Sequence, residues 1–195
     1  MNSRVGVMGL SGVLALVMFG SLRFTPSATQ DRLTAVPAHS KLVFSQESPD
    51  DFFTCYPGLG VQEDGFPQVW DALHSPLQPL FQFCENRPMA VATFGRRTHR
   101  GSWVAVSELG GPAATALRWR LLLFPPEGVV PARSYAVWPV WTFEHPRLPV
   151  WTRVRFAVTE SLLICSISGD SHDIYRVLDA ADGRSASMDE RRTSP

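Results

Sequence analysis

The chain begins with an uncharged apolar run, Val5–Leu22, which lies between Arg4 and Arg23. A helix over these eighteen residues would be roughly 27 Å long, close to the ~30 Å hydrocarbon thickness of a bilayer. The run contains four glycines, which weaken a helix in water but are common in membrane helices. It therefore predicts a transmembrane helix that acts as an N-terminal signal anchor over residues 1–23.

Two other interpretations of this run remain open. A cleaved signal peptide needs small residues at positions −3 and −1 of the cut, and Phe19–Phe24 offers no such pair, while Pro26-Ser27-Ala28 places proline at −3. A buried globular helix or a flexible leader is the third interpretation. The flanking charges are nearly balanced, but a short tail before a long domain favours an extracytoplasmic domain, either periplasmic or extracellular.

About 170 residues follow the run, enough for one domain with its own core. The chain has 18 Lys and Arg against 18 Asp and Glu, so its formal net charge is zero. Because phosphate binding needs a basic surface, nucleic acid is not an expected partner. The expected partners are the membrane and other envelope or membrane proteins, and no cofactor is expected.

The rest of the chain divides into a connector (24–38), an extracytoplasmic domain (39–182) and a polar tail (183–195) that we predict to be disordered. Strand-forming residues predict strands at Lys41–Ser45, Met89–Phe94, Ser102–Glu108, Arg133–Val137, Val140–Phe143, Val150–Val158 and Leu162–Ser168. The alternation is clear in Val150–Val158, and Leu162–Ser168 is apolar on both faces, which predicts a central strand. Capping residues and helical spacing predict helices after Ser48, over Phe66–Leu73, after Ser75, over Ala113–Phe124 and after Asp170 or Ser171. This order predicts an α+β fold, an antiparallel sheet of hairpins with helices packed on one face.

Three cysteines could affect how the domain is stabilised. In an extracytoplasmic domain, Cys55 and Cys84 could form a disulfide and leave Cys165 alone as a small buried hydrophobe. The alternative is three unpaired thiols, because spacing does not determine disulfide connectivity.

Two surfaces could bind a partner. The first is a basic hairpin tip that could meet lipid headgroups or an acidic partner, although solvated loops are commoner; it comprises Arg96, Arg97, His99 and Arg100. The second is an aromatic platform for a sugar or a peptide, interleaved with prolines, and it comprises Trp138, Trp141 and Trp151. Large aromatics more often fill a core between sheet and helix, so that interpretation stays open.

The segment Gly169-Asp170-Ser171-His172 resembles the nucleophile block of GDS-type esterases, which need a serine on a strand-to-helix turn. Here the block lies near the end of the chain, and asparagine occurs only at Asn2 and Asn86, so no downstream asparagine could serve an oxyanion. Asp170 and Ser171 are explained as helix caps. The five histidines show no metal-ligand spacing. We therefore expect neither catalytic residues nor a metal site.

Three short patterns carry a resemblance to a group of proteins: Val36-Pro37-Ala38 before a strand, Trp70-Asp71-Ala72-Leu73 before a proline, and Leu162-Leu163-Ile164-Cys165-Ser166 before the last helix. In these features the chain resembles bacterial single-pass membrane-anchored extracytoplasmic proteins of unknown function. The resemblance implies architecture only. Taken together, the sequence observations leave two main hypotheses, a structural or interaction domain at the envelope and a small accessory subunit of a membrane complex; an esterase is the third and weakest.

Overall fold

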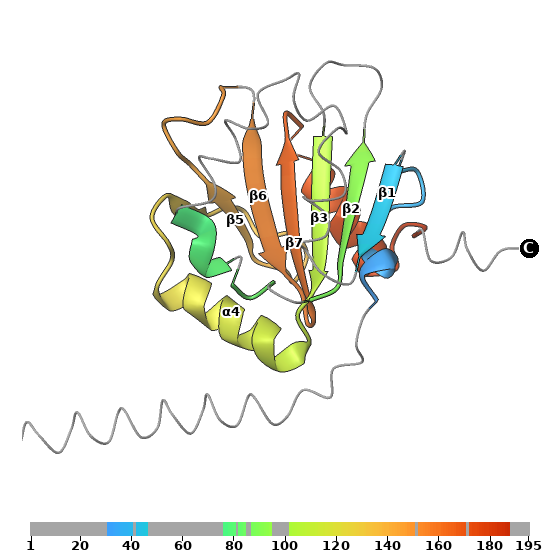
Figure 1. The fold of residues 1–195 in the computed structure, drawn as a ribbon, viewed down its shortest axis with the longest axis horizontal. Helices are drawn as coiled ribbons and strands as arrows, with labels where there is room; N and C mark the ends of the chain where they lie inside the picture. The colour runs from blue at the N-terminus through green and yellow to red at the C-terminus, as the bar shows by residue number, and fades with distance from the viewer. Residues whose placement is uncertain are drawn as a thin grey trace, which may run out of the picture.

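A computed structural model describes residues 31–40, 42–46, 76–80, 82–84, 87–94, 102–150, 152–170 and 172–187. Within these ranges seven strands form one antiparallel sheet in the order β1-β2-β3-β7-β6-β5-β4 (Figure 1). The elements are η1 (Arg32–Ala35), β1 (Leu42–Gln46), β2 (Met89–Phe94), β3 (Ser102–Glu108), α4 (Gly111–Leu123), β4 (Val129–Pro131), β5 (Val140–Phe143), β6 (Arg153–Val158), β7 (Leu162–Ser168) and α5 (Asp173–Ala181). The predicted α+β class with an antiparallel sheet is therefore confirmed.

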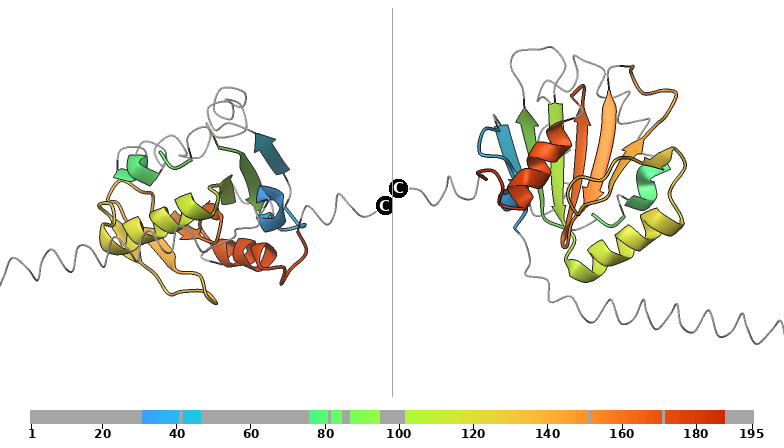
Figure 2. Two further views of the ribbon diagram at one scale, coloured as in Figure 1. Left: turned by 90° about the horizontal axis from the view of Figure 1, so that it is seen from below. Right: turned by 180° about the vertical axis from the view of Figure 1, so that it is seen from behind.

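The helices cover both faces of this sheet, as the two views of Figure 2 show. On one face α5 and η1 bury Ile174 and Leu33 against Val104 and Val106 of β3. On the other face α4 and the helical residues 76–80 pack against β5, β6 and β7. The prediction that the helices share one face is wrong, because neighbouring strand residues point to opposite sides and both sets of side chains in the central strands are apolar.

Four strands have the bounds that the sequence predicts: β2, β3, β5 and β7. In the central pair, Val106 of β3 lies opposite Ile164 of β7, and both face α5. The next residue on β7, Cys165, lies opposite Ala105 and faces α4. Strand β7 is central because it is apolar on both faces, as its sequence predicts.

Helix α4 forms where the sequence predicts a helix, two residues earlier than Ala113. Gly110 precedes it with a φ of 73°, a left-handed conformation that glycine adopts without strain, and Pro112 stands in its first turn. The helix ends at Leu123, before Pro125 and Pro126, which have no N–H to continue it. Residues 76–80 also form the helix predicted after Ser75 and bury Leu77 and Leu80 against the same sheet face.

The segment between α4 and β5 differs from its prediction. No strand forms over Arg133–Val137; instead Tyr135 and Trp138 pair across a tight turn, with Ala136 at a φ of 50°. On the side away from β6, strand β5 pairs with β4, a strand that the sequence did not predict. Gly128, directly before β4, lets the chain pass close to Glu144. Its φ is 79°, and a Cβ at this position would lie only 2.5 Å from the carbonyl oxygen of Glu144, so another residue would not fit.

Both ends of the described chain join the domain. The predicted connector contributes Leu33, Ala35 and Val36 to the core. Residues 183–187 fall in the predicted disordered tail, yet Ser187 pairs with Pro37, and the Ala38 N–H donates to the Ala186 carbonyl at 2.9 Å. The helices predicted over residues 1–23, after Ser48 and over Phe66–Leu73 lie outside the described residues. Among those that the structure describes, no helix is long and apolar enough to span a bilayer.

Candidate interaction surface on helix α4

Helix α4 is apolar on two opposite sides. Its inner side places Ala114, Leu117 and Leu121 against the sheet, each almost fully buried. Its outer side carries Pro112, Ala116, Trp119 and Leu123, which follow one another at the helical spacing of four, three and four residues. A helix that covers a sheet normally carries polar residues on its outer side, so this second apolar stripe is the feature to explain.

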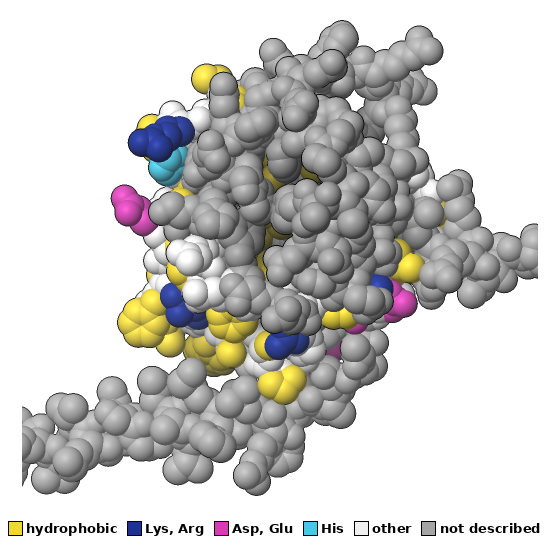
Figure 3. Space-filling view, in the orientation of Figure 1, with side chains coloured by type: hydrophobic (Ala, Val, Ile, Leu, Met, Phe, Trp, Pro, Cys, Tyr) yellow, Lys and Arg dark blue, Asp and Glu magenta, His cyan; other side chains and the backbone are white. Residues whose placement is uncertain are grey.

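The side chains around the end of α4 are among the most exposed large hydrophobics of the described chain. Leu122 is 59%, Leu123 48% and Phe124 74% exposed, and Trp119 lies beside them at 36%. Figure 3 shows hydrophobic side chains gathered over this part of the molecule, with arginines among them. Exposed apolar side chains that lie close together are a common feature of surfaces that contact a partner or a membrane.

The charged side chains on α4 itself are both basic. Arg118 and Arg120 flank the outer stripe of α4, and no acidic residue occurs between Gly111 and Pro126. The surface is thus an apolar stripe between two guanidinium groups. We call the outer stripe with Leu122, Phe124 and these two arginines the α4 surface. Chemically it can bury apolar groups and bind anions beside them.

The outer surface of α5 is different, because aromatic and charged side chains there bind one another. The rings of Tyr135 and Tyr175 stack with centroids 4.6 Å apart, and the guanidinium of Arg184 lies 5.2 Å from the Tyr135 ring. The Tyr135 hydroxyl donates to Asp179 Oδ2 at 3.0 Å. This hydrogen bond is the main cause that raises the pKa of Tyr135 above its ordinary value of 10.0. The hydroxyl, the carboxylate, the guanidinium and the two rings thus use one another as partners within the domain.

Two of the three tryptophans predicted to form an aromatic platform lie on opposite faces of the sheet. Trp138 packs on the α5 side, where its Nε1 donates to Asp182 Oδ1 at 2.7 Å. Trp141 is 2% exposed on the α4 side and stacks on Phe156. The two therefore share no surface, and the alternative interpretation, that the aromatics fill the core, holds for Trp141. Trp151 lies outside the described residues.

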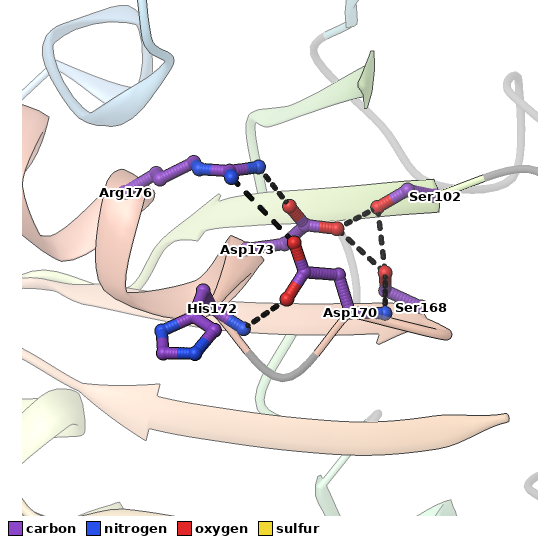
Figure 4. Close-up of polar contacts among 6 residues, drawn as sticks. All are labelled: Ser102, Ser168, Asp170, His172, Asp173 and Arg176. Carbon is purple, nitrogen blue, oxygen red and sulfur yellow. Dashed lines mark hydrogen bonds and ion pairs between the residues drawn. The ribbon is translucent and has the colours of Figure 1, made fainter. Parts of the chain in front are cut away.

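A buried polar cluster fixes the start of α5 (Figure 4). The carboxylate of Asp173, itself 1% exposed, accepts hydrogen bonds from the hydroxyls of Ser102 and Ser168, the latter at 2.5 Å. Its other oxygen accepts from Arg176 Nη1 at 2.7 Å. A buried carboxylate requires such partners. The cluster joins β3, β7 and α5, and its contacts are those of a structural network.

The esterase-like segment lies at this cluster. Asp170 Oδ1 accepts the backbone N–H of His172 at 2.8 Å, and the other oxygen lies 3.5 Å from Arg176. His172, not Asp170 or Ser171, occupies the N-cap position of α5, and its ring meets the edge of Tyr175. In Figure 4 the imidazole lies away from the two serine hydroxyls. Ser171 lies outside the described residues.

The remaining predicted site residues can be placed only in part. The basic tip (Arg96, Arg97, His99 and Arg100) and Cys55 lie outside the described residues. Cys84 and Cys165 are free thiols at the α4 face. Burial raises the pKa of Cys84 to about 11, against the opposing influence of the Ser107 hydroxyl and Arg87. Burial, with a contribution from Cys84, raises the pKa of Cys165 to about 12. Both thiols are therefore poor nucleophiles at neutral pH.

The α4 surface was not singled out from the sequence, although the signal was there. The spacing of Pro112, Ala116, Trp119 and Leu123 is visible in the sequence, but only the fold shows which stripe faces outward. In the part of the chain that the structure describes, no group of three or more His, Cys, Asp or Glu could hold a metal ion. The chain matches no protein-family model, no curated protein and no solved structure.

Proposed function

We propose that this chain is a single-pass, membrane-anchored extracytoplasmic domain that acts by binding, with the α4 surface as its contact site. The apolar run Val5–Leu22 supports the anchor by its length and lack of charge. The observation that carries binding is the second apolar stripe of α4. Fully burying a leucine or phenylalanine side chain contributes about 1.5–3 kcal/mol, so a partner that covers Leu122, Leu123 and Phe124 gains a substantial binding energy.

The anchor is tested on the full-length chain in cells. We expect the chain in the membrane pellet after a carbonate wash, with its domain digested only by protease added outside the cytoplasmic membrane. The physical reason is that an apolar helix in the hydrocarbon core resists extraction, whereas peripheral contacts do not. Recovery of the whole chain in the soluble fraction, with its N-terminus intact, would contradict the proposal.

Binding through the α4 surface is tested by purification in mild detergent. The second candidate, an accessory subunit, is favoured by the same exposed stripe, since an apolar helix face also fits a partner's helix. In that case the chain migrates with a larger assembly, and the double variant Leu122→Ser, Leu123→Ser separates from it. The matched control is Val137→Ser, at an exposed turn remote in sequence from α4. Equal behaviour of both variants would rule out assembly with a protein partner through the α4 surface.

A further inference from the structure

We infer that the α4 surface lies in the headgroup region of an anionic bilayer, on the leaflet from which the anchor emerges. This inference rests on the proposed function and names the partner of the same surface. It takes the bilayer, and not a protein, as the occupant of the outer stripe of α4.

The chemistry of the stripe fits a lipid interface. Tryptophan is enriched at the boundary between headgroups and acyl chains, and Trp119 lies on the stripe, between Arg118 and Arg120 in the sequence. Arg118 and Arg120 lie on its flanks, so both guanidinium groups can reach lipid phosphates while Leu122, Leu123 and Phe124 enter the acyl region. No acidic side chain stands on α4 itself, and its two arginines outweigh the single carboxylate of Glu127 just beyond Pro126.

The position of the tether brings this surface to the membrane. Residues 24–31 separate the predicted anchor from η1, and eight extended residues span at most about 27 Å. Figure 1 shows η1 beside β1 and α4 along the lower end of the sheet, with the last turn of α4 toward β5. A domain held on so short a tether has a high effective concentration at the bilayer, so a stripe of a few side chains suffices for stable contact.

The experiment measures quenching of Trp119 by brominated lipid. The full-length chain is reconstituted into vesicles of phosphatidylglycerol and phosphatidylcholine, with or without bromines near the top of the acyl chains. The chain has six tryptophans, so the contribution of Trp119 is isolated as the wild-type signal minus that of Trp119→Phe. The matched control is Trp138→Phe, which isolates a tryptophan on the opposite face of the sheet.

We expect bromines to reduce the Trp119 signal by about half, because an interfacial helix buries its apolar face roughly 5–10 Å deep, and to leave the Trp138 signal unchanged. If the chain enters the vesicles but Trp119 is quenched no more than Trp138, the inference is overturned and the proposed anchor stands. Burial of Trp119 by a second copy would give that same result. If the chain does not stay with the washed vesicles, the proposed function itself fails, and the inference with it.

Discussion

Helices α4 and α5 cover opposite faces of one sheet, yet they present opposite kinds of surface to their surroundings. Each buries an apolar stripe, Leu117 and Leu121 in α4 and Ile174 and Val177 in α5. Outside, α5 carries ion pairs and stacked tyrosines, whereas α4 carries leucine, tryptophan and phenylalanine. Packing on the sheet requires only the inner stripes. The outer stripe of α4 is therefore not needed for the fold, which is why we assign it a role in binding.

The sharpest test of this comparison sets the two stripes of α4 against each other. Replacing Leu117 with alanine removes a fully buried side chain and leaves a cavity, so we expect a loss of about 3 kcal/mol in the free energy of unfolding. Leu123→Ala, on the outer stripe, should change it by less than about 0.5 kcal/mol. Urea unfolding of both variants in one mild detergent measures the difference. A similar loss for both would mean that the outer stripe is part of the core.

The α5 side is tested at its buried carboxylate. Asp173→Ala leaves the hydroxyls of Ser102 and Ser168 without their acceptor in a buried site, so we expect a loss of about 2 kcal/mol. The control is Asp179→Ala, whose carboxylate is partly exposed to water and pairs with Arg184; it should cost about 1 kcal/mol or less. Thermal or urea unfolding measures both. Equal losses would show that the surface network holds α5 as firmly as the buried one.

The smallest expected effect is a pH dependence from the α4 side. The folded-state pKa values of Cys84 and Cys165, about 11 and about 12, lie above the ordinary 9.0. Below about pH 8 both thiols are protonated in the folded and unfolded chains, and the stability is unaffected by them. Above pH 9 the unfolded chain loses these protons first, so stability falls as the pH rises toward 11, by about 1 kcal/mol per thiol at pH 10.

Urea midpoints between pH 8 and pH 10 measure this fall, with the double variant Cys84→Ala, Cys165→Ala as the control in which it is reduced. In the native chain both thiols should also react slowly with a thiol reagent at neutral pH. Rapid labelling of either thiol in the folded protein would contradict the burial on which the pKa shifts depend.

Local sequence patterns predicted most of the described strands and helices, but they did not predict the contacts between residues far apart in the chain. Strands β2, β3, β5 and β7 could be predicted because each is a short apolar stretch bounded by turn or loop residues, and β7 is apolar on both faces. Strand β4 was missed because it has three residues and ends in Pro131. The hydrogen bond between Ser102 and Asp173 joins positions 71 apart in the chain. The residues around either position do not predict it. Placement of the two helices on opposite faces likewise depends on pairings across the whole sheet.

The pairing of Pro37 with Ser187 has a mechanical consequence. The segment by which the described chain enters the domain and the segment by which it leaves are paired with each other beside the sheet. A pull on Asp31 and on Ser187 would therefore load this pairing, together with the Arg32–Glu108 ion pair and the buried η1, before the strand ladder. These contacts lie outside the hydrogen-bond ladder of the seven strands. They can therefore break under tension while the strand pairings stay intact, so the ends of the domain can separate without unfolding the sheet.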